Sequence, residues 1–425
     1  MSALRTRLRA AVAQRLVQGP GPLQRLRARG LDPLLGRPPT LELYYEPGDP
    51  HSHLAARCLP RLAERVRLPL TVRVVGEPEA ALYPEADKQR GFALRDAERI
   101  ALAYGLDFPE AATMPPPQAC FEAARLLAGI AEPRAFAERE AVVADALFRG
   151  QPLPTGERLG EAETQRLLAA NGQRRARLGH YLPGMWQLAG DWFWGVDRMT
   201  HLEAALRGHD ALEGDAPLLA FDAAKARLPS PPAMETSLEF FFSFRSPYSY
   251  LAAEALREAL ATLPMPLQVR PVLPMAMRGM KVPSRKRLYI VRDVKREADR
   301  LGLPFGRIAD PIGAGAERCL TVFQLAKGVE QQLDFLVSAS RAVWAEAIDV
   351  ATDDGLRQVC ERAGMSWKRA AEKLAAGMDL DAAEANRSAL FEAGLWGVPS
   401  YRWGAFSTWG RDRFWMIEAL ARREV

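Results

Sequence analysis

The sequence has few cysteines and none of the spacings that redox or structural metal sites use. Its cysteines are Cys58, Cys120, Cys319 and Cys360, which stand far apart, and no Cys-x-x-Cys pair occurs. A thiol–disulfide active site needs such a pair, and a structural zinc site needs clustered cysteine and histidine ligands. The pattern argues against both, and so few scattered thiols are typical of a reducing compartment. We therefore expect a cytoplasmic protein without a bound metal.

The sequence also lacks long apolar runs. No stretch approaches the roughly 18 apolar residues of a membrane-spanning helix, so we expect no membrane span. Residues 1–31 hold seven arginines and no acid, but the apolar centre of a secretory signal peptide is missing. We interpret residues 1–39 as a basic arm in solvent; a transit peptide and an arm that touches anionic surfaces stay open as alternatives.

Charge and aromatic residues give no sign of nucleic-acid binding. The net charge is +5, and outside the arm the chain is close to neutral. Basic and aromatic side chains are not interleaved as they are in proteins that bind single strands. A hydrophobic content of 48% and a charged content of 26% are typical of a globular protein. We expect a small molecule, not a nucleic acid, as the ligand.

The two halves of the chain resemble each other. LELYYEPGDPHSHLAARCL, residues 41–59, matches LEFFFSFRSPYSYLAAEAL, residues 238–256, at an offset of 197. Further on, Gly195 matches Gly410 at an offset of 215, so the second half has gained 18 residues, which we expect at 352–367. A chain of 425 residues is too long for one ordinary core. The sequence predicts a tandem duplication.

Each half shows the same predicted order of elements. An apolar strand, a helix and a second strand come first, and a long helical insert follows. Then come Leu182-Pro183 or Val398-Pro399, a short strand and a terminal helix. Since strand–helix–strand is a parallel unit, we expect an α/β fold in each half.

The halves are separated by a proline-rich segment. Pro229, Pro231 and Pro232 lie within a few residues of one another, which favours a stiff, extended connector. We place the linker at residues 208–236. The expected domains are then residues 40–207 and residues 237–425, with the basic arm in front of them.

The candidate chemistry lies where the first helix of the second half begins. Ser246 stands at the N-cap position and Pro247 at the first helical position. A serine there is most often only a cap, but its hydroxyl can also donate to an anion, which the helix dipole favours. In the first half Asp49 occupies this position, and a carboxylate repels an anionic ligand.

Several motifs, in order, carry a resemblance to a known family. FFFSFRSPYSYLA, GMKVPSRKRLYIVRD, GLPF, WGVPSY and WGRDR span most of residues 237–423. This half resembles the family of 2-hydroxychromene-2-carboxylate isomerases and kappa-class glutathione transferases. The resemblance implies a DsbA-like thioredoxin fold with a helical insertion. With the repeat, the expected fold is two tandem thioredoxin-like (DsbA-like) domains, the first of them degenerate.

The resemblance also implies a cofactor, glutathione, and a set of residues around it. Ser246 would be the catalytic residue beside the sulfur. The implied cofactor-binding residues are Pro247, Tyr248, Val398, Pro399, Arg411 and Asp412. Pro399 would be a cis-proline, the Val398 backbone would pair with the tripeptide, and Asp412 would face its amino end.

Two departures from the family pattern concern this set. Met280 stands where the family usually has asparagine, and Arg411 stands where it often has asparagine or serine. Arg411 can grip a carboxylate with two hydrogen bonds, or it can be a solvated surface arginine. In the first half, Asp197 falls opposite Asp412 and, with a gap of one residue, Pro183 falls opposite Pro399.

Three functions follow as hypotheses. The first is a glutathione-dependent isomerase, or a kappa-like transferase, acting on an aromatic-acid or other electrophilic small molecule through residues 237–425. The second is a non-catalytic module that binds glutathione or a protein. A disulfide oxidoreductase fits the implied fold but lacks the cysteine pair. Since the family commonly forms homodimers, the two halves are also expected to dock as a pseudo-dimer or to support a homodimer.

Overall fold

The computed structural model describes residue 17 and residues 39–78, 85–279 and 283–423. Almost all of the expected basic arm, and with it Met280 and Lys281, lies outside the described residues. The described residues form two compact units: an N-terminal unit of residues 39–227 and 283–289, and a C-terminal unit of residues 228–279 and 290–423 with Val17. None of the described helices is long and apolar enough to cross a membrane.

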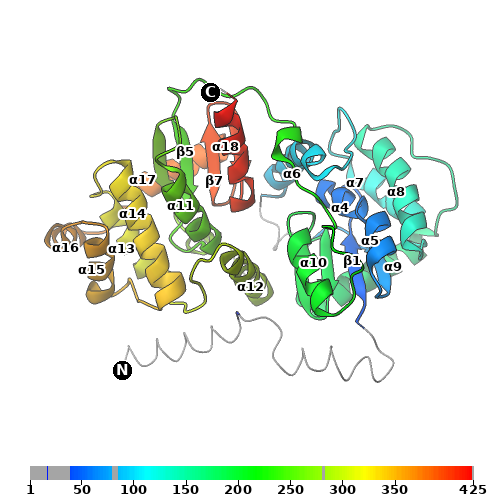
Figure 1. The fold of residues 1–425 in the computed structure, drawn as a ribbon, viewed down its shortest axis with the longest axis horizontal. Coiled ribbons are helices and arrows are strands. Elements are labelled where there is room, and N and C mark those ends of the chain that lie inside the picture. The colour runs from blue at the N-terminus through cyan, green and yellow to red at the C-terminus, as the bar shows by residue number, and fades with distance from the viewer. Residues whose placement is uncertain (1–16, 18–38, 79–84, 280–282, 424–425) are drawn as a thin grey trace. The chain divides into compact units, whose positions relative to one another are not determined.

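The N-terminal unit alternates strands and helices around a sheet of four strands (Figure 1). Its elements are β1 (Leu41–Tyr45), α4 (Pro50–Ala56), α5 (Leu59–Arg65), β2 (Leu70–Val74), α6 (Ala86–Ile100), η3 (Leu102–Tyr104), α7 (Pro117–Leu127), α8 (Pro133–Phe148), α9 (Glu161–Arg177), β3 (Met185–Leu188), β4 (Asp191–Trp194), α10 (Met199–Gly208) and η4 (Ala223–Lys225). The strand order is β2-β1-β3-β4, with β1 and β2 parallel and the other neighbours antiparallel.

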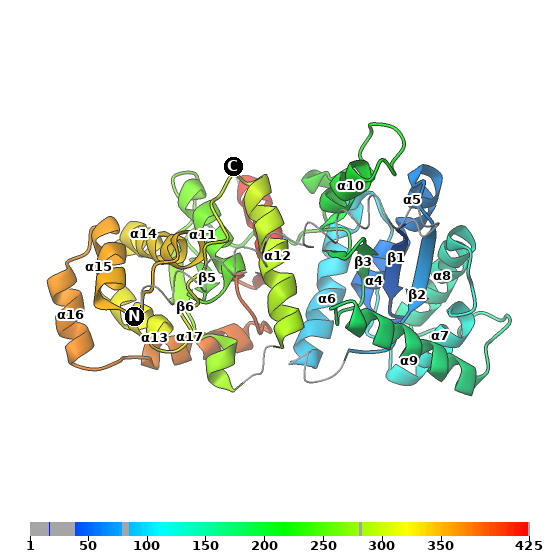
Figure 2. The same cartoon turned by 90° about the horizontal axis from the view of Figure 1, so that it is seen from below.

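The C-terminal unit has the same kind of sheet. Its elements are β5 (Leu238–Phe242), α11 (Pro247–Ala259), β6 (Leu267–Pro271), η5 (Met275–Arg278), α12 (Ser284–Arg300), α13 (Ala314–Phe323), α14 (Gly328–Arg341), the π-helical η6 (Ala342–Glu346), α15 (Asp353–Arg362), α16 (Trp367–Ala375), α17 (Asp381–Glu392), β7 (Ser400–Trp403), β8 (Phe406–Trp409), η7 (Arg411–Arg413) and α18 (Phe414–Arg422). The order is β6-β5-β7-β8, again with one parallel pair and two antiparallel pairs. In Figure 2, α12 and α14 lie on opposite sides of β5 and β6.

The two sheets agree in register as well as in order. Tyr44 pairs with Met185 in one sheet, and Phe241 pairs with Ser400 in the other, which are the positions that the offsets of 197 and 215 predict. A side-chain hydrogen bond to the last residue of the second strand is also repeated. Asn171 donates to the Val74 carbonyl at 2.9 Å, and Asn386 donates to the Pro271 carbonyl at 2.9 Å. These contacts fix the last helix before β3 or β7 against the sheet in each unit.

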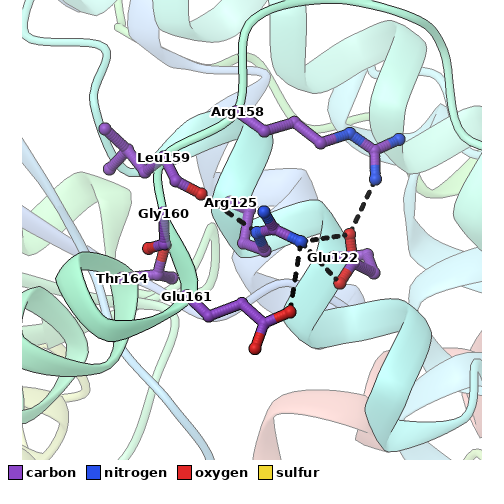
Figure 3. A network of polar contacts seen from close by, with 7 residues as sticks. All are labelled: Glu122, Arg125, Arg158, Leu159, Gly160, Glu161 and Thr164. Atoms are coloured by element: carbon purple, nitrogen blue, oxygen red, sulfur yellow. Dashed lines mark hydrogen bonds and ion pairs between the residues drawn. The ribbon is translucent and has the colours of Figure 1, made fainter.

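One difference between the helical layers of the two units lies before the last helix of each insert, α9 or α17. In the N-terminal unit, residues 149–160 join α8 to α9, and Arg125 of α7 holds this loop (Figure 3). Its guanidinium donates to the Leu159 carbonyl at 3.0 Å and to Glu122 at 3.1 Å. In the C-terminal unit, α15 and α16 stand between η6 and α17. Residues 352–367, where the repeat predicted the additional residues, run from the N-cap of α15 to the first residue of α16.

A buried carboxylate lies on the first strand of each sheet. Glu42 of β1 pairs with Arg73, and Glu239 of β5 pairs with Arg270 and Arg402 from the strands on either side. A buried charge is costly unless it is paired, so these arginines determine whether the strand tolerates the acid. Burial alone would raise the pKa of Glu239, but hydrogen bonds from Arg402 and Arg270 outweigh burial, and the pKa is lowered.

All four cysteines are free thiols that belong to the packing. Cys58, Cys319 and Cys360 are buried, and Cys120 is half-buried. Burial raises the pKa of Cys58 to about 12 and that of Cys360 to about 11. The pKa of Cys120 is raised to about 12, because burial and the neighbouring acid Glu46 both disfavour its thiolate. The thiolate is the nucleophile in disulfide exchange, so these environments do not support that chemistry.

Glu239→Gln tests the role of the buried ion pair. The pKa of Glu239 is lower in the folded state, so its stabilisation is present above the unfolded value of 4.5 and is lost as the pH falls through the folded value. The free energy of unfolding of the natural protein should therefore fall more steeply on acidification than that of the variant. Chemical denaturation at a series of pH values measures this, and parallel curves would contradict it.

The cysteine environments make a second prediction. In the folded protein at neutral pH, iodoacetamide should leave all four cysteines unmodified. The pKa of Cys58, Cys120 and Cys360 is raised to about 11 or 12, and burial also raises the pKa of Cys319, so almost no thiolate is present. In denaturant, all four should react. Mass spectrometry of the alkylated peptides provides the measurement, and rapid labelling of half-buried Cys120 in the folded protein would refute the prediction.

Candidate active site

The turn between β5 and α11 has the geometry that its sequence predicts. Apolar residues end at Phe244, and Ser246 adopts an extended conformation with φ −100° and ψ 113°. Its Oγ accepts a hydrogen bond from the Ser249 amide at 3.1 Å, and Pro247 occupies the first helical turn. Ser246 is thus the N-cap of a helix of 13 residues, with a half-buried hydroxyl at the positive end of the helix dipole.

A second segment meets this turn at the start of β7. The Ser246 hydroxyl donates to the Val398 carbonyl, with Oγ and O 3.3 Å apart. The Val398–Pro399 peptide bond is cis, as the resemblance implies, and among the described residues it is the one cis peptide bond. The sheet order causes this meeting, because β7 lies beside β5 and its first residue, Ser400, pairs with Phe241.

Arg411 and Asp412 lie where β8 turns into η7. The turn is placed by Gly410, whose amide donates to the Pro399 carbonyl at 2.9 Å and whose φ of +95° favours glycine. The structure therefore brings Ser246, Val398 and Pro399 together, and it joins the Arg411–Asp412 turn to them through one backbone hydrogen bond. Pro247 is buried in the first turn of α11.

Two polar groups at this corner have no hydrogen-bond partner in the part of the chain that the structure describes. The Nε atom of Arg411 and the hydroxyl of Tyr401 are both buried, and neither has a hydrogen-bond partner among the described residues. Burial raises the pKa of Tyr401; Arg411 opposes the rise and Asp412 adds to it, so all three groups interact. Two buried donors without an acceptor are costly, because each has lost its hydrogen bonds to water without gaining another.

Tyr401 is a site residue that the sequence analysis did not find. Its counterpart at an offset of 215 is Trp186, whose Nε1 donates to the Gly195 carbonyl at 3.2 Å. The indole N–H of Trp186 is thus hydrogen-bonded within the N-terminal unit, whereas the hydroxyl of Tyr401 has no partner among the described residues. The exchange of tryptophan for tyrosine is visible in the repeat, but an aromatic residue in a strand usually indicates only core packing.

Neighbouring side chains hold the Ser246 turn in place. Arg245 forms two hydrogen bonds with Asp310, of 2.7 and 2.8 Å, and so ties the turn to the loop before α13. The Tyr248 hydroxyl donates to Asp293 of α12 at 2.6 Å. Tyr248, expected to contact the cofactor, is therefore held by its hydroxyl to the neighbouring helix.

The corresponding turn of the N-terminal unit is built differently. Asp49 caps α4 by accepting hydrogen bonds from the Ser52 amide at 2.8 Å and from its hydroxyl at 2.6 Å. The expectation that Pro183 stands opposite Pro399 is wrong. The strand register places Gly184 there, and the Gly195 amide donates to the Gly184 carbonyl at 2.7 Å, as the Gly410 amide does to the Pro399 carbonyl. No gap is needed, since the offset of 215 is constant through this segment.

The two histidines after Asp49 do not form a metal pair. His51 lies 3.4 Å from Asp96 and His53 lies 2.7 Å from Glu140, so each imidazole pairs with a carboxylate of a different helix. Within the part of the chain that the structure describes, no group of three or more potential ligand side chains could hold a metal ion.

Known proteins are similar to the C-terminal half of the chain. A family model for the DsbA-like thioredoxin domain matches residues 237–421. A 2-hydroxychromene-2-carboxylate isomerase of Pseudomonas putida is 25% identical over 197 residues, which cover 44% of this chain and 94% of that protein. The enzyme of the same name from Sphingobium xenophagum is 24% identical over 194 residues, covering 44% of this chain and 98% of that protein.

Two solved structures are also similar over the same share of the chain. A 2-hydroxychromene-2-carboxylate isomerase shows a TM-score of 0.38 and 24% identity, covering 44% of this chain and 95% of that one. The cytosolic disulfide reductase DsbM from Pseudomonas aeruginosa with GSH shows a TM-score of 0.32 and 14% identity, covering 44% and 96%. Residues 237–421 thus form a DsbA-like thioredoxin domain that is similar in sequence to 2-hydroxychromene-2-carboxylate isomerases.

Proposed function

We propose that the C-terminal unit is a glutathione-dependent isomerase of the 2-hydroxychromene-2-carboxylate type, or a kappa-like glutathione transferase. The observation that carries the proposal is the contact of the Ser246 hydroxyl, at the N-terminus of α11, with the Val398 carbonyl before cis-Pro399. The names of the two curated relatives support the isomerase. The substrate is an aromatic acid or another small electrophile.

Ser246 stabilises an anionic sulfur in this proposal. Bound glutathione would supply a thiol nucleophile, whose pKa in water is about 8.5. The Ser246 hydroxyl is neutral and carries one proton, which it donates to Val398 in the ligand-free protein. When a sulfur anion lies at the end of α11, the hydroxyl turns its proton to the anion, while Oγ still accepts from Ser249. The helix dipole favours the same charge.

The Arg411 corner binds a carboxylate of the ligand. The unpaired Nε of Arg411 and hydroxyl of Tyr401 are the two donors, and Asp412 supplies a negative charge for an ammonium group nearby. Glutathione carries both charges at its γ-glutamyl end, so the residues present fit this cofactor. Val398, whose carbonyl accepts from the Ser246 hydroxyl, and Pro399 would lie beside the sulfur if glutathione were bound.

The N-terminal unit is, in this proposal, a degenerate thioredoxin-like domain that arose by tandem duplication. The equal strand order, the constant offsets and the equivalent hydrogen bonds of Asn171 and Asn386 support it. Asp49 replaces the neutral hydroxyl and Gly184 replaces the cis-proline, so this unit contributes no thiolate-stabilising group. The two units are proposed to act as a pseudo-dimer in the cytoplasm.

A second candidate is a module that binds glutathione without turnover. The Ser246 hydroxyl already makes two hydrogen bonds inside the protein, one to Val398 and one from Ser249, which favours a structural cap. Calorimetry with glutathione and a turnover assay on electrophiles separate the candidates. Heat of binding without turnover identifies the module, and turnover identifies the enzyme.

Substitution of Ser246 tests the catalytic role. Ser246→Ala should lower glutathione-dependent turnover at least about tenfold, the value of one hydrogen bond to a charged group. It also removes the cap, at a cost of about 1 kcal/mol, so Ser246→Asp is the second variant. This variant keeps a cap, as Asp49 does in α4, but should also lose turnover, because its carboxylate repels the sulfur anion. Asp49→Ala is the matched control and should leave turnover unchanged. Full activity in both Ser246 variants would refute the proposal.

Substitution of Arg411 tests the carboxylate site. Arg411→Ala should weaken glutathione binding about tenfold in calorimetry, because a charged hydrogen-bond donor is lost. Arg411→Lys should restore only part of the affinity, since an ammonium cannot reproduce the fork of a guanidinium. Exposed Arg422 of α18 offers a control, and its change to alanine should have no effect. Equal affinities of all three variants would remove Arg411 from the site.

A further inference from the structure

We infer that Asp293 is a positioning residue of the active site, which acts through Tyr248 on the turn that carries Ser246. The inference rests on the proposed function, since it assigns a further residue to the same site. Asp293 lies on α12 and is fully buried. The Tyr248 hydroxyl donates to its Oδ2 at 2.6 Å, and Arg296 lies 3.2 Å from its Oδ1.

The geometry of this contact makes it a strong anchor. A buried carboxylate is costly unless it is hydrogen-bonded, and a hydroxyl that donates to an anion forms a short, strong bond. Tyr248 follows Ser246 by two residues and lies in the first turn of α11. Its bond to Asp293 therefore fixes the first turn of α11 to α12. Orientation of the Ser246 hydroxyl depends on that turn, because Oγ accepts from the Ser249 amide.

The same arrangement occurs in the N-terminal unit. At an offset of 197, His51 takes the place of Tyr248 and Asp96 takes the place of Asp293. His51 Nε2 lies 3.4 Å from Asp96 Oδ2, and both side chains are buried. This unit has a different N-cap, and Gly184 takes the place of cis-Pro399, but it has the carboxylate on the long helix. The carboxylate thus serves to hold the turn, whichever group stands at the N-cap.

Hydrogen exchange in the ligand-free protein tests the anchor without any ligand. Asp293→Asn should speed exchange of the amides of Tyr248–Leu251 at least severalfold and leave those of His51–Leu54 unchanged. Asp96→Asn is the matched control and should do the reverse. Unchanged exchange in Tyr248–Leu251 of the Asp293→Asn variant would overturn the inference, whatever happens to activity.

Kinetics test the consequence for catalysis. Asp293→Asn should lower kcat about fivefold, as expected for one hydrogen bond, and leave KM for glutathione within about twofold. The milder Tyr248→Phe should lower kcat by about the same factor. The pH profile of the reaction should move upward, because a poorly aimed hydroxyl stabilises the thiolate less; a loss of stability alone would not move it. The double variant should be no worse than either single one, since the two residues act as a unit.

The outcomes separate the inference from the proposed function. An unmoved pH profile, or additive effects in the double variant, would overturn the positioning role while Ser246 stays catalytic. If Ser246→Ala and Ser246→Asp both keep full turnover, the proposed function fails, and the exchange measurement alone decides whether Asp293 holds the turn. Asp96→Asn should keep full turnover, and a loss equal to that of Asp293→Asn would also overturn the inference.

Discussion

The hydrogen bond between the Ser246 hydroxyl and the Val398 carbonyl connects the parts of the C-terminal unit that are far apart in sequence. It forms because β7 lies antiparallel to β5. The residues before β7 and the residues after β5 therefore meet at the same end of the sheet. The helix that begins there brings a partial positive charge, and the turn after β8 brings Arg411 and Asp412. A change in strand order would separate all of these groups.

The sequence was sufficient for features that depend on local chemistry. A serine and a proline after an apolar strand predict an N-cap, and Ser246 is one. The repeat predicted the matching registers of the two sheets, and the resemblance implied the cis bond at Pro399. The roles of Tyr248, Val398, Pro399, Arg411 and Asp412 toward glutathione stay predictions, because they concern a ligand and not the chain itself.

Other features depend on three-dimensional packing and were missed. The sequence analysis matched Pro183 with Pro399 because both are prolines. The strand register instead places Gly184 at the position equivalent to Pro399. The unpaired hydroxyl of Tyr401 cannot be read from an aromatic residue in a strand, since such residues usually fill the core. The role of the buried Asp293 carboxylate likewise cannot be predicted from the sequence, because it depends on a hydrogen bond from Tyr248 of the neighbouring helix.

Trp186 and Tyr401 occupy equivalent positions of the two sheets but differ in whether their polar group is hydrogen-bonded. The buried indole N–H of Trp186 donates to the Gly195 carbonyl, so this polar group is satisfied within the N-terminal unit. The phenol of Tyr401 is equally buried, but its hydroxyl has no hydrogen-bond partner among the described residues. The side chain at this one position of β3 or β7 thus decides whether a buried polar group of the sheet is satisfied within its own unit.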